Sequence, residues 1–350
     1  MSIVVVAAVE AQAVAKADPR ALAMGGGYVA VADGYAALQW NPAGLWVSGR
    51  NEAALTFGNV PFEGGPWVEA LRVAAGFSDA LDAIDAVRIL APASSGLAGE
   101  RVFGAYIVSP RFGGAFQQVT YVDEVSRLRG GRVEIDMASL RTREFQFSGA
   151  HPFMQGRFVI GGSARIVQAQ GRLHSVSLEA LAENDLTAGG LLSRARGGPV
   201  ASNDTVFSVD VGVLLMPTAK FRLGGVVKNL NAPDLDSDPQ GITRLPRQFR
   251  VGGLLMPTPS IKVTLDFDLT TDVFVEGGRE RRELGGGIEW AADSVALRGG
   301  LLFDMQAIER RATYTFGVGL SGETVRADLA GSWAPDRDGF GWIGALAAEF

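Results

Sequence analysis

Few residues of this chain have the types and spacing that catalysis or metal binding needs. His151 and His174 are the only imidazoles and cysteine is absent, which excludes a thiolate metal site, a Cys nucleophile and a His-rich metal cluster. A Ser-His-acid hydrolase needs a histidine that orients a nucleophile. His151 is predicted to lie in a short turn before Pro152, and His174 beside Ser175 at the start of a long loop, but Gly-x-Ser-x-Gly does not occur. We therefore expect no enzymatic activity, no cofactor and no metal.

Phosphate chemistry is equally poorly supported. The glycines between Gly25 and Gly34 lack the strand–helix–strand unit and the downstream acid of a dinucleotide site. Lys and Arg number 32 against 38 Asp and Glu, giving a net charge of -6, and a nucleic-acid binder is usually basic. Nucleic acid is therefore excluded as a partner.

Much of the chain shows the alternation of apolar and polar residues that is typical of β-strands. In residues 262–269, Val263 and Leu265 fall on one face with the other apolar residues, while Asp266 and Asp268 fall on the opposite face. Two acids on one side of a strand need water, so one face is expected to be polar and the other greasy.

Fourteen such segments can be counted, and long and short connections alternate between them. Short connections rich in Pro or Gly, such as 109–111, 216–218, 256–259 and 321–322, all fall at one end of the inferred sheet. This alternation is typical of an outer-membrane barrel with short periplasmic turns and longer external loops. The strands are expected near residues 53–58, 102–108, 112–122, 132–149, 156–171, 204–215, 219–229, 247–255, 260–270, 281–290, 294–303, 311–320, 323–333 and 340–350.

A lipid bilayer is the expected environment of this sheet. No apolar run approaches the roughly 18 residues of a spanning helix. Strands can cross hydrocarbon only if the sheet closes and satisfies every backbone group. The sequence thus predicts an all-β fold, a 14-stranded antiparallel transmembrane β-barrel, with Trp290, Trp333 and Trp342 in interfacial girdles. A soluble β protein is the remaining alternative.

The two ends of the chain carry export and assembly signals. Residues 3–9 form a short apolar run, and Ala11-Gln12-Ala13 fits cleavage after Ala13, although no basic residue precedes the run. Residues 1–13 are interpreted as a truncated signal peptide; an ordinary buried N-terminal strand is the alternative. Phe350 ends an alternating strand and resembles the C-terminal signal that bacterial barrel-assembly machinery recognises. The alternative is that Phe350 is only a hydrophobic residue at the end of the chain.

The segment before the first strand carries two motifs. Met24-Gly25-Gly26 leads through residues 29–33 (VAVAD) to residues 41–45 (NPAGL). Together they resemble the N-terminal region of the FadL-like superfamily of outer-membrane barrels, which includes fatty acid transporters, PorV/PorQ proteins and TraF-like conjugal-transfer barrels. Gly27 and Gly34 depart from the usual Ala and Asp, and Asp18-Pro19-Arg20 and the Gly-rich later strands resemble the PorV branch more closely.

The resemblance implies a role for the N-terminal segment. In fatty acid transporters this segment folds into the lumen as a hatch, so residues 14–50 are expected to be a plug and residues 51–350 the barrel. The residues carried over to the plug are Gly25, Gly26, Asn41, Pro42 and Gly44. Locally, Asn41 can cap a helix and Pro42 suits its first position. The alternative is a simple adaptor into the first strand.

Two external loops have helical spacing. Residues 66–90 and 177–192 place apolar residues on one helix face, and a helix at a barrel mouth can dock a greasy ligand, contact a partner or cap the mouth. The candidate contacts are Trp67, Leu71, Leu81, Ile84, Leu178 and Leu181.

Taken together, these features predict a protein of the Gram-negative outer membrane. The favoured function is passive transport of hydrophobic small molecules, with a hydrophobic ligand and the bilayer as partners. The alternative is a PorV-like accessory of a protein secretion or surface-assembly system, whose partners are secretion proteins.

Overall fold

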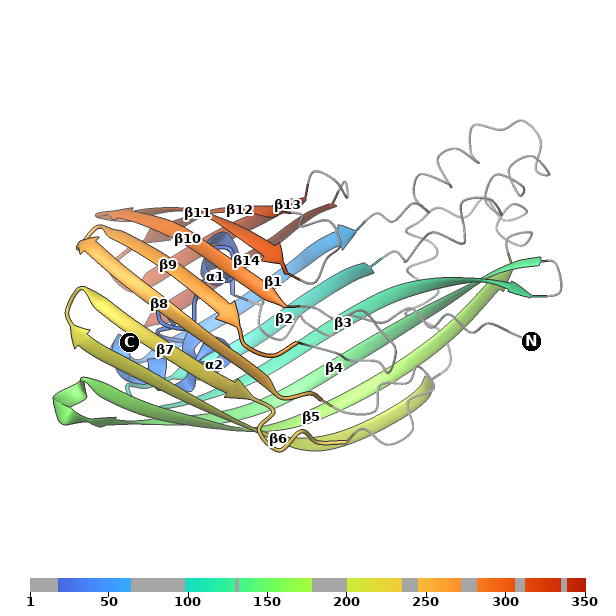
Figure 1. The fold of residues 1–350 in the computed structure, drawn as a ribbon, viewed down its shortest axis with the longest axis horizontal. Coiled ribbons are helices and arrows are strands. Elements are labelled where there is room, and N and C mark those ends of the chain that lie inside the picture. The colour runs from blue at the N-terminus through green and yellow to red at the C-terminus, as the bar shows by residue number, and fades with distance from the viewer. Residues whose placement is uncertain are drawn as a thin grey trace.

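The computed structural model describes residues 18–63, 98–129, 132–177, 200–234, 245–271, 282–305, 312–334 and 339–350. Fourteen strands in these ranges form one closed sheet in which each strand is antiparallel to both neighbours and β1 pairs with β14 (Figure 1). The predicted 14-stranded antiparallel barrel is confirmed. The strands are β1 (Glu52–Glu63), β2 (Ala98–Val108), β3 (Phe112–Arg129), β4 (Arg132–Phe153), β5 (Phe158–Ser177), β6 (Val200–Thr218), β7 (Phe221–Lys228), β8 (Gln248–Thr258), β9 (Ile261–Asp268), β10 (Glu283–Ala292), β11 (Val295–Asp304), β12 (Ala312–Ser321), β13 (Val325–Ala334) and β14 (Gly339–Glu349).

The alternation along each strand sorts side chains between the two faces of the wall. On β9, Leu265 is 60% exposed on the outside, whereas Asp266 is 1% exposed on the inside. Trp290, Trp333 and Trp342 also face outward, close to strand ends. An apolar outer face around a sheet with no free edge is the arrangement that hydrocarbon tolerates. No helix among the described residues is long and apolar enough to cross a membrane.

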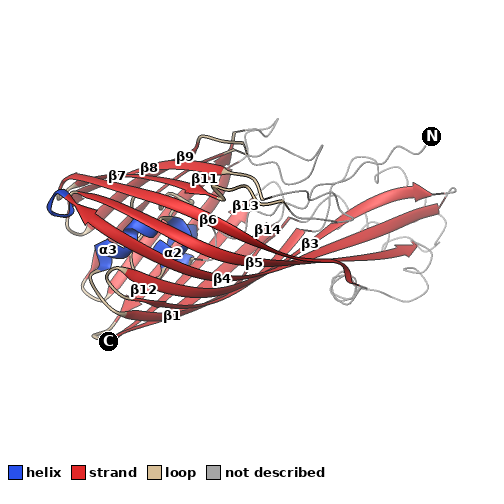
Figure 2. Cartoon of the chain, turned by 90° about the horizontal axis from the view of Figure 1, so that it is seen from below, coloured by secondary structure: helices blue, strands red, loops and turns tan. Residues whose placement is uncertain are grey.

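Strands β3 to β6 are much longer than the rest of the wall. They have 18, 22, 20 and 19 residues, while a tilted strand crosses a bilayer with about 9–11. Figures 1 and 2 show them running far beyond the other strands. The loop expected between residues 122 and 132 is therefore wrong, because β3 and β4 stay paired as far as Arg129 and Arg132. Alternation marks where a strand runs and cannot mark where it leaves the membrane.

Two predicted turns also belong to strands. Residues 216–218 and 256–258 are the last residues of β6 and β8, although each stretch contains a proline, Pro217 or Pro257. Proline has no N–H to give to the ladder. The pairing accommodates it through a register shift beside each proline, between Leu215 and Thr218 and between Leu255 and Thr258.

The short helices of the N-terminal segment lie inside the barrel near its short-turn end (Figures 1 and 2). They are α1 (Pro19–Ala23), α2 (Ala36–Trp40), the 3-10 helix η2 (Pro42–Gly44) and α3 (Leu45–Ser48). A fifth short helix, η4 (Met154–Gly156), forms the β4–β5 turn. Helix α1 begins where Asp18 accepts hydrogen bonds from the backbone N–H groups of Arg20 and Ala21.

Candidate functional site

The N-terminal segment supplies the apolar core of the barrel. Every residue from Asp18 to Leu45 except Asp33 is buried. Among the residues that the structure describes, five of the six largest fully buried side chains belong to it: Trp40, Tyr28, Tyr35, Met24 and Leu45. We call residues 18–48 the luminal segment. Residues 21–32, together with Ala36 and Trp40, pack their apolar side chains mainly on one another, whereas Tyr35, Leu38 and Leu45 pack on an apolar patch of the wall that includes Tyr106, Val159 and Leu214.

Wall side chains bind the backbone of the luminal segment. Asp266 accepts hydrogen bonds from the N–H groups of Tyr28 and Val29, both over 2.7 Å. Thr315 accepts one from the N–H of Gly25 over 3.0 Å. Three more contacts of this kind follow: Thr264 donates to the carbonyl of Gly27 (2.6 Å), Gln146 donates to the carbonyl of Leu38 (2.6 Å), and Glu52 accepts from the N–H of Tyr35 (3.2 Å). These contacts satisfy backbone groups that burial would otherwise leave unpaired.

Glycines of the wall make room for this backbone. A Cβ atom added to Gly161 would overlap the backbone of Pro42 and Ala43, and one added to Gly300 would overlap that of Met24. The wall glycines whose Cβ would overlap the luminal segment are Gly113, Gly161, Gly212, Gly224, Gly285, Gly287, Gly300 and Gly317, on β3, β5, β6, β7, β10, β11 and β12. The segment therefore rests directly on the inner wall at seven of the fourteen strands.

The two predicted glycines after α1 have the conformations that favour glycine. Gly25 and Gly26 have φ of +63° and +74°. In addition, a Cβ on Gly25 would overlap the carbonyl oxygen of Leu301, and one on Gly44 would overlap that of Ala32. No larger residue fits Gly25 or Gly44 without a shift of backbone.

Asn41 joins two parts of the luminal segment to the wall. Its Oδ1 accepts the N–H of Ala43 over 3.1 Å, so it caps η2 with Pro42 at the first position, and the predicted cap is confirmed. Its Nδ2 donates to the carbonyls of Val29 and Val213, both over 3.0 Å. One side chain thus fixes η2, the earlier stretch and strand β6.

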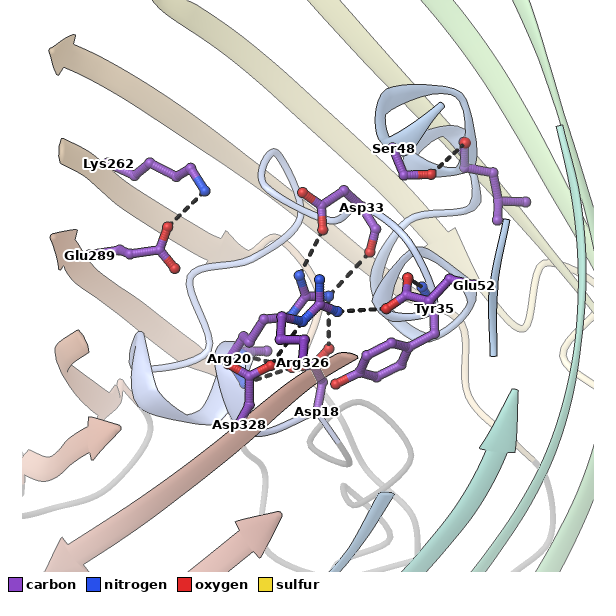
Figure 3. A network of polar contacts seen from close by, with 12 residues as sticks. Asp18, Arg20, Asp33, Tyr35, Ser48, Glu52, Lys262, Glu289, Arg326 and Asp328 are labelled. Carbon is purple, nitrogen blue, oxygen red and sulfur yellow. Dashed lines mark hydrogen bonds and ion pairs between the residues drawn. The ribbon is translucent and has the colours of Figure 1, made fainter. Parts of the chain in front are cut away.

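Arg20 is the charged centre of the luminal segment (Figure 3). Its Nη1 lies 2.8 Å from Oδ1 of Asp33, and Asp18 lies 3.6 Å from Nη2. Burial raises the pKa of Asp33, but Arg20 and more distant cations of the wall outweigh it and bring this pKa down to about 2. Buried charges are tolerated because they are paired.

Charges of alternating sign line the wall near the short-turn end. Lys262 and Glu289 at one end of this row, and Arg326 and Glu52 at the other, appear in Figure 3. Successive ion pairs join Lys262 to Glu289 (2.7 Å), Glu289 to Arg298 (2.6 Å), Arg298 to Asp328 (2.7 Å), Asp328 to Arg326 (3.0 Å) and Arg326 to Glu52 (2.6 Å). Because Glu52 also holds Tyr35, the row ends on the luminal segment.

The other predicted residues are not part of this site. Phe350 is 72% exposed, and its N–H donates to the carbonyl of Asn51. His151 lies within β4 and not in a turn, and its ring contacts Phe153 on the outer face. His174 lies in β5 and not in a loop. The mouth residues Trp67, Leu71, Leu81, Ile84, Leu178 and Leu181 lie outside the described residues.

The sequence reasoning missed the wall residues that hold the segment. Alternation places Asp266 on the polar inner face, but it does not mark Asp266, Thr315 or the wall glycines as partners of the luminal segment. Pairs of adjacent glycines in a strand, such as Gly161 and Gly162, could have indicated these contacts. Successive residues of a strand face opposite sides, so one glycine of each pair must face the lumen and leave room there for another backbone.

A closed barrel with an apolar exterior, a polar inner wall and an occupied lumen defines the class: a transmembrane β-barrel of the outer-membrane type. The family model described as "F plasmid transfer operon, TraF, protein" matches residues 73–284, and the chain belongs to this family. The outer-membrane barrel that the sequence resemblance implies is confirmed, whereas closeness to the PorV/PorQ branch stays a prediction.

Solved structures share this fold. A TodX monoaromatic hydrocarbon channel deltaS2 mutant aligns with a TM-score of 0.62 at 14% identity, covering 96% of this chain and 99% of that one. The TodX deltaS2S3 mutant aligns with a TM-score of 0.59 at 14% identity, covering 95% and 97%. No curated protein matches this sequence.

Proposed function

We propose that this protein is a passive outer-membrane conduit for hydrophobic small molecules and that the luminal segment is its plug. The observation that carries this proposal is the composition of the lumen. An apolar, aromatic segment fills the lumen, and the inner wall around it carries many buried charged and polar side chains beside a smaller apolar patch, so water and ions meet a barrier while a hydrophobic solute meets Trp40, Tyr28 and Tyr35. The fold shared with a monoaromatic hydrocarbon channel supports the same reading.

The plug has two lobes with a seam between them. Residues 18–32 contact mainly β7 and β9–β14, and residues 35–48 contact mainly β1–β6. Gly34, with a φ of +54°, lies between the lobes. Across the seam the rings of Tyr28 and Trp40 meet edge to face, with centroids 6.1 Å apart. A hydrophobic solute that crosses the barrel passes along this aromatic seam, and no energy source is needed because transport follows the concentration gradient.

The second candidate function is an accessory of a protein secretion or surface-assembly system. Strands β3–β6 favour it, because they continue well past the length that a bilayer requires and present a wide sheet to other proteins. The family description, which refers to a plasmid transfer operon, is compatible with such an assembly.

One experiment separates the two. Val122 and Ser139 are register partners, so residues 123–138 can be replaced by a two-residue Asn-Gly turn without disturbing the wall below. Native mass spectrometry of the full chain, extracted from its own membrane, then reports what is bound. A conduit carries hydrophobic ligands other than membrane phospholipids in both forms, because a phospholipid bound to the outer wall does not report on the lumen. An accessory carries protein partners that are lost from the shortened form. Loss of protein partners, together with no such hydrophobic ligand in either form, would overturn the conduit.

A further inference from the structure

The outer face of β3–β6 changes from apolar to polar along a sharp boundary. Phe116, Phe145, Ile166 and Phe207 are register partners across these four strands and form the last apolar row. The next outward row, two residues further along each strand, consists of Gln118, Arg143, Gln168 and Thr205. An amphiphile lying against this wall would meet greasy rings and hydrogen-bond donors in direct succession.

Two arginines occupy this boundary on β4. Arg143 is exposed, and its Nε donates to Oε1 of Gln118 over 3.2 Å, which orients the guanidinium. Arg141 faces outward two residues beyond it and is half-buried beside its register partner Gln170. The described outward positions of β3–β6 around them, residues 116–120, 141–145, 166–170 and 203–207, include no acid on the same face. The boundary is therefore cationic.

The height of the boundary corresponds to a membrane surface. Phe153, at the short-turn end of β4, and Arg143 are separated by 10 residues of continuous strand. At about 3.3 Å per residue and a tilt of about 40°, this spans about 25 Å, which is about the height of the apolar band of outer-membrane barrels. Arg143 thus lies at the level of lipid headgroups.

We propose that Arg141 and Arg143 bind the phosphate headgroup of a membrane lipid, whose acyl chains lie on Phe145, Phe147 and Ile166. A guanidinium presents a planar pair of donors that matches two phosphate oxygens, and the neighbouring glutamines offer further N–H groups. The apolar row directly below selects a lipid over free phosphate. The site lies on the outer wall, so it is independent of the proposed conduit.

The test uses the full chain in neutral detergent with three probes. Phosphatidic acid has both headgroup and acyl chains, diacylglycerol lacks the phosphate, and inorganic phosphate lacks the chains. Binding is measured by native mass spectrometry titration on the wild type, on Arg141→Gln/Arg143→Gln, on Arg143→Lys, and on Arg157→Gln, an exposed arginine at the opposite end of the wall.

We expect phosphatidic acid to bind about tenfold more weakly to the double variant and about threefold more weakly to Arg143→Lys, which keeps the charge and loses the fork. Arg157→Gln should bind like the wild type, and the other two probes should bind far more weakly to every form. The proposal would be overturned if phosphatidic acid bound equally well to the wild type, to Arg143→Lys and to the double variant. An equal loss in Arg157→Gln, or displacement of the lipid by inorganic phosphate at the same concentration, would also overturn it.

Discussion

Oδ2 of Asp266 on β9 lies 2.7 Å from the backbone nitrogen of Tyr28, a residue 238 positions earlier in the chain. The same oxygen also accepts the N–H of Val29. One carboxylate of the wall therefore holds the backbone of the luminal segment in place at Tyr28 and Val29. The barrel and its luminal segment are for this reason expected to fold and unfold as one unit.

Removing this carboxylate should loosen the luminal segment. Asp266→Ala leaves two buried N–H groups without their acceptor, and hydrogen bonds to charged groups contribute about 1.5–3 kcal/mol each. We expect the free energy of unfolding in detergent to fall by about 3–6 kcal/mol, measured by guanidinium titration. Asp266→Asn keeps an acceptor oxygen and should lose less than Asp266→Ala; equal stability of all three proteins would contradict the role assigned to Asp266.

Neighbouring glycines on β5 provide a matched pair of substitutions. Gly161→Ala places a methyl group against the backbone of Pro42 and Ala43, while Gly162→Ala places one on the outer face, where the nearest atom is 3.8 Å away. Overpacking of this kind costs about 1–3 kcal/mol. Gly161→Ala should lower stability and raise ion conductance in planar bilayers, because the second lobe is pushed off the wall. Gly162→Ala should behave like the wild type.

The same contrast is expected on β11. Gly300→Ala meets the backbone of Met24, whereas Gly299→Ala meets nothing closer than 3.9 Å. If the outward variants conduct as much as the inward ones, the luminal segment does not close the barrel.

Acid should weaken the attachment of Asp33. Its pKa of about 2 lies below the ordinary 3.8; burial alone would raise it, but Arg20, Lys262 and Arg326 outweigh burial. Because the unfolded chain binds this proton more tightly, the stability that Asp33 contributes is complete above about pH 4 and is lost as the pH falls from about 4 to about 2. Thermal unfolding midpoints of wild type and Asp33→Asn should therefore differ most above about pH 4 and converge towards about pH 2. A constant difference across this range would contradict the pairing.

The sequence predicts the wall well because lipid outside and polar groups inside impose a strict alternation. In residues 262–269 the predicted faces are the observed ones, and the closed sheet of fourteen strands follows from counting such segments. The predictions that are wrong concern the ends of strands, because the alternation of apolar and polar residues does not show where a strand ends. The loop expected after residue 122 is paired strand, and Pro217 and Pro257 lie at strand ends with shifted register.

The site is only half predictable from sequence. The motifs around Gly25 and Asn41 mark the luminal segment, and the cap at Asn41 follows from local chemistry. The partners of these residues do not, because Gly161 and Asp266 acquire their roles from the path of a backbone that is remote in sequence. Long-range packing between an irregular segment and a regular wall leaves no periodic trace.

The most direct test of the conduit is uptake by whole cells, whose outer leaflet resists hydrophobic solutes. The gene is removed from the host and restored as wild type, and entry of a labelled aromatic hydrocarbon is compared with that of a hydrophilic solute of similar mass. The account predicts that wild type accelerates entry of the hydrocarbon and leaves entry of the hydrophilic solute unchanged. Equal hydrocarbon entry with and without the protein would contradict it.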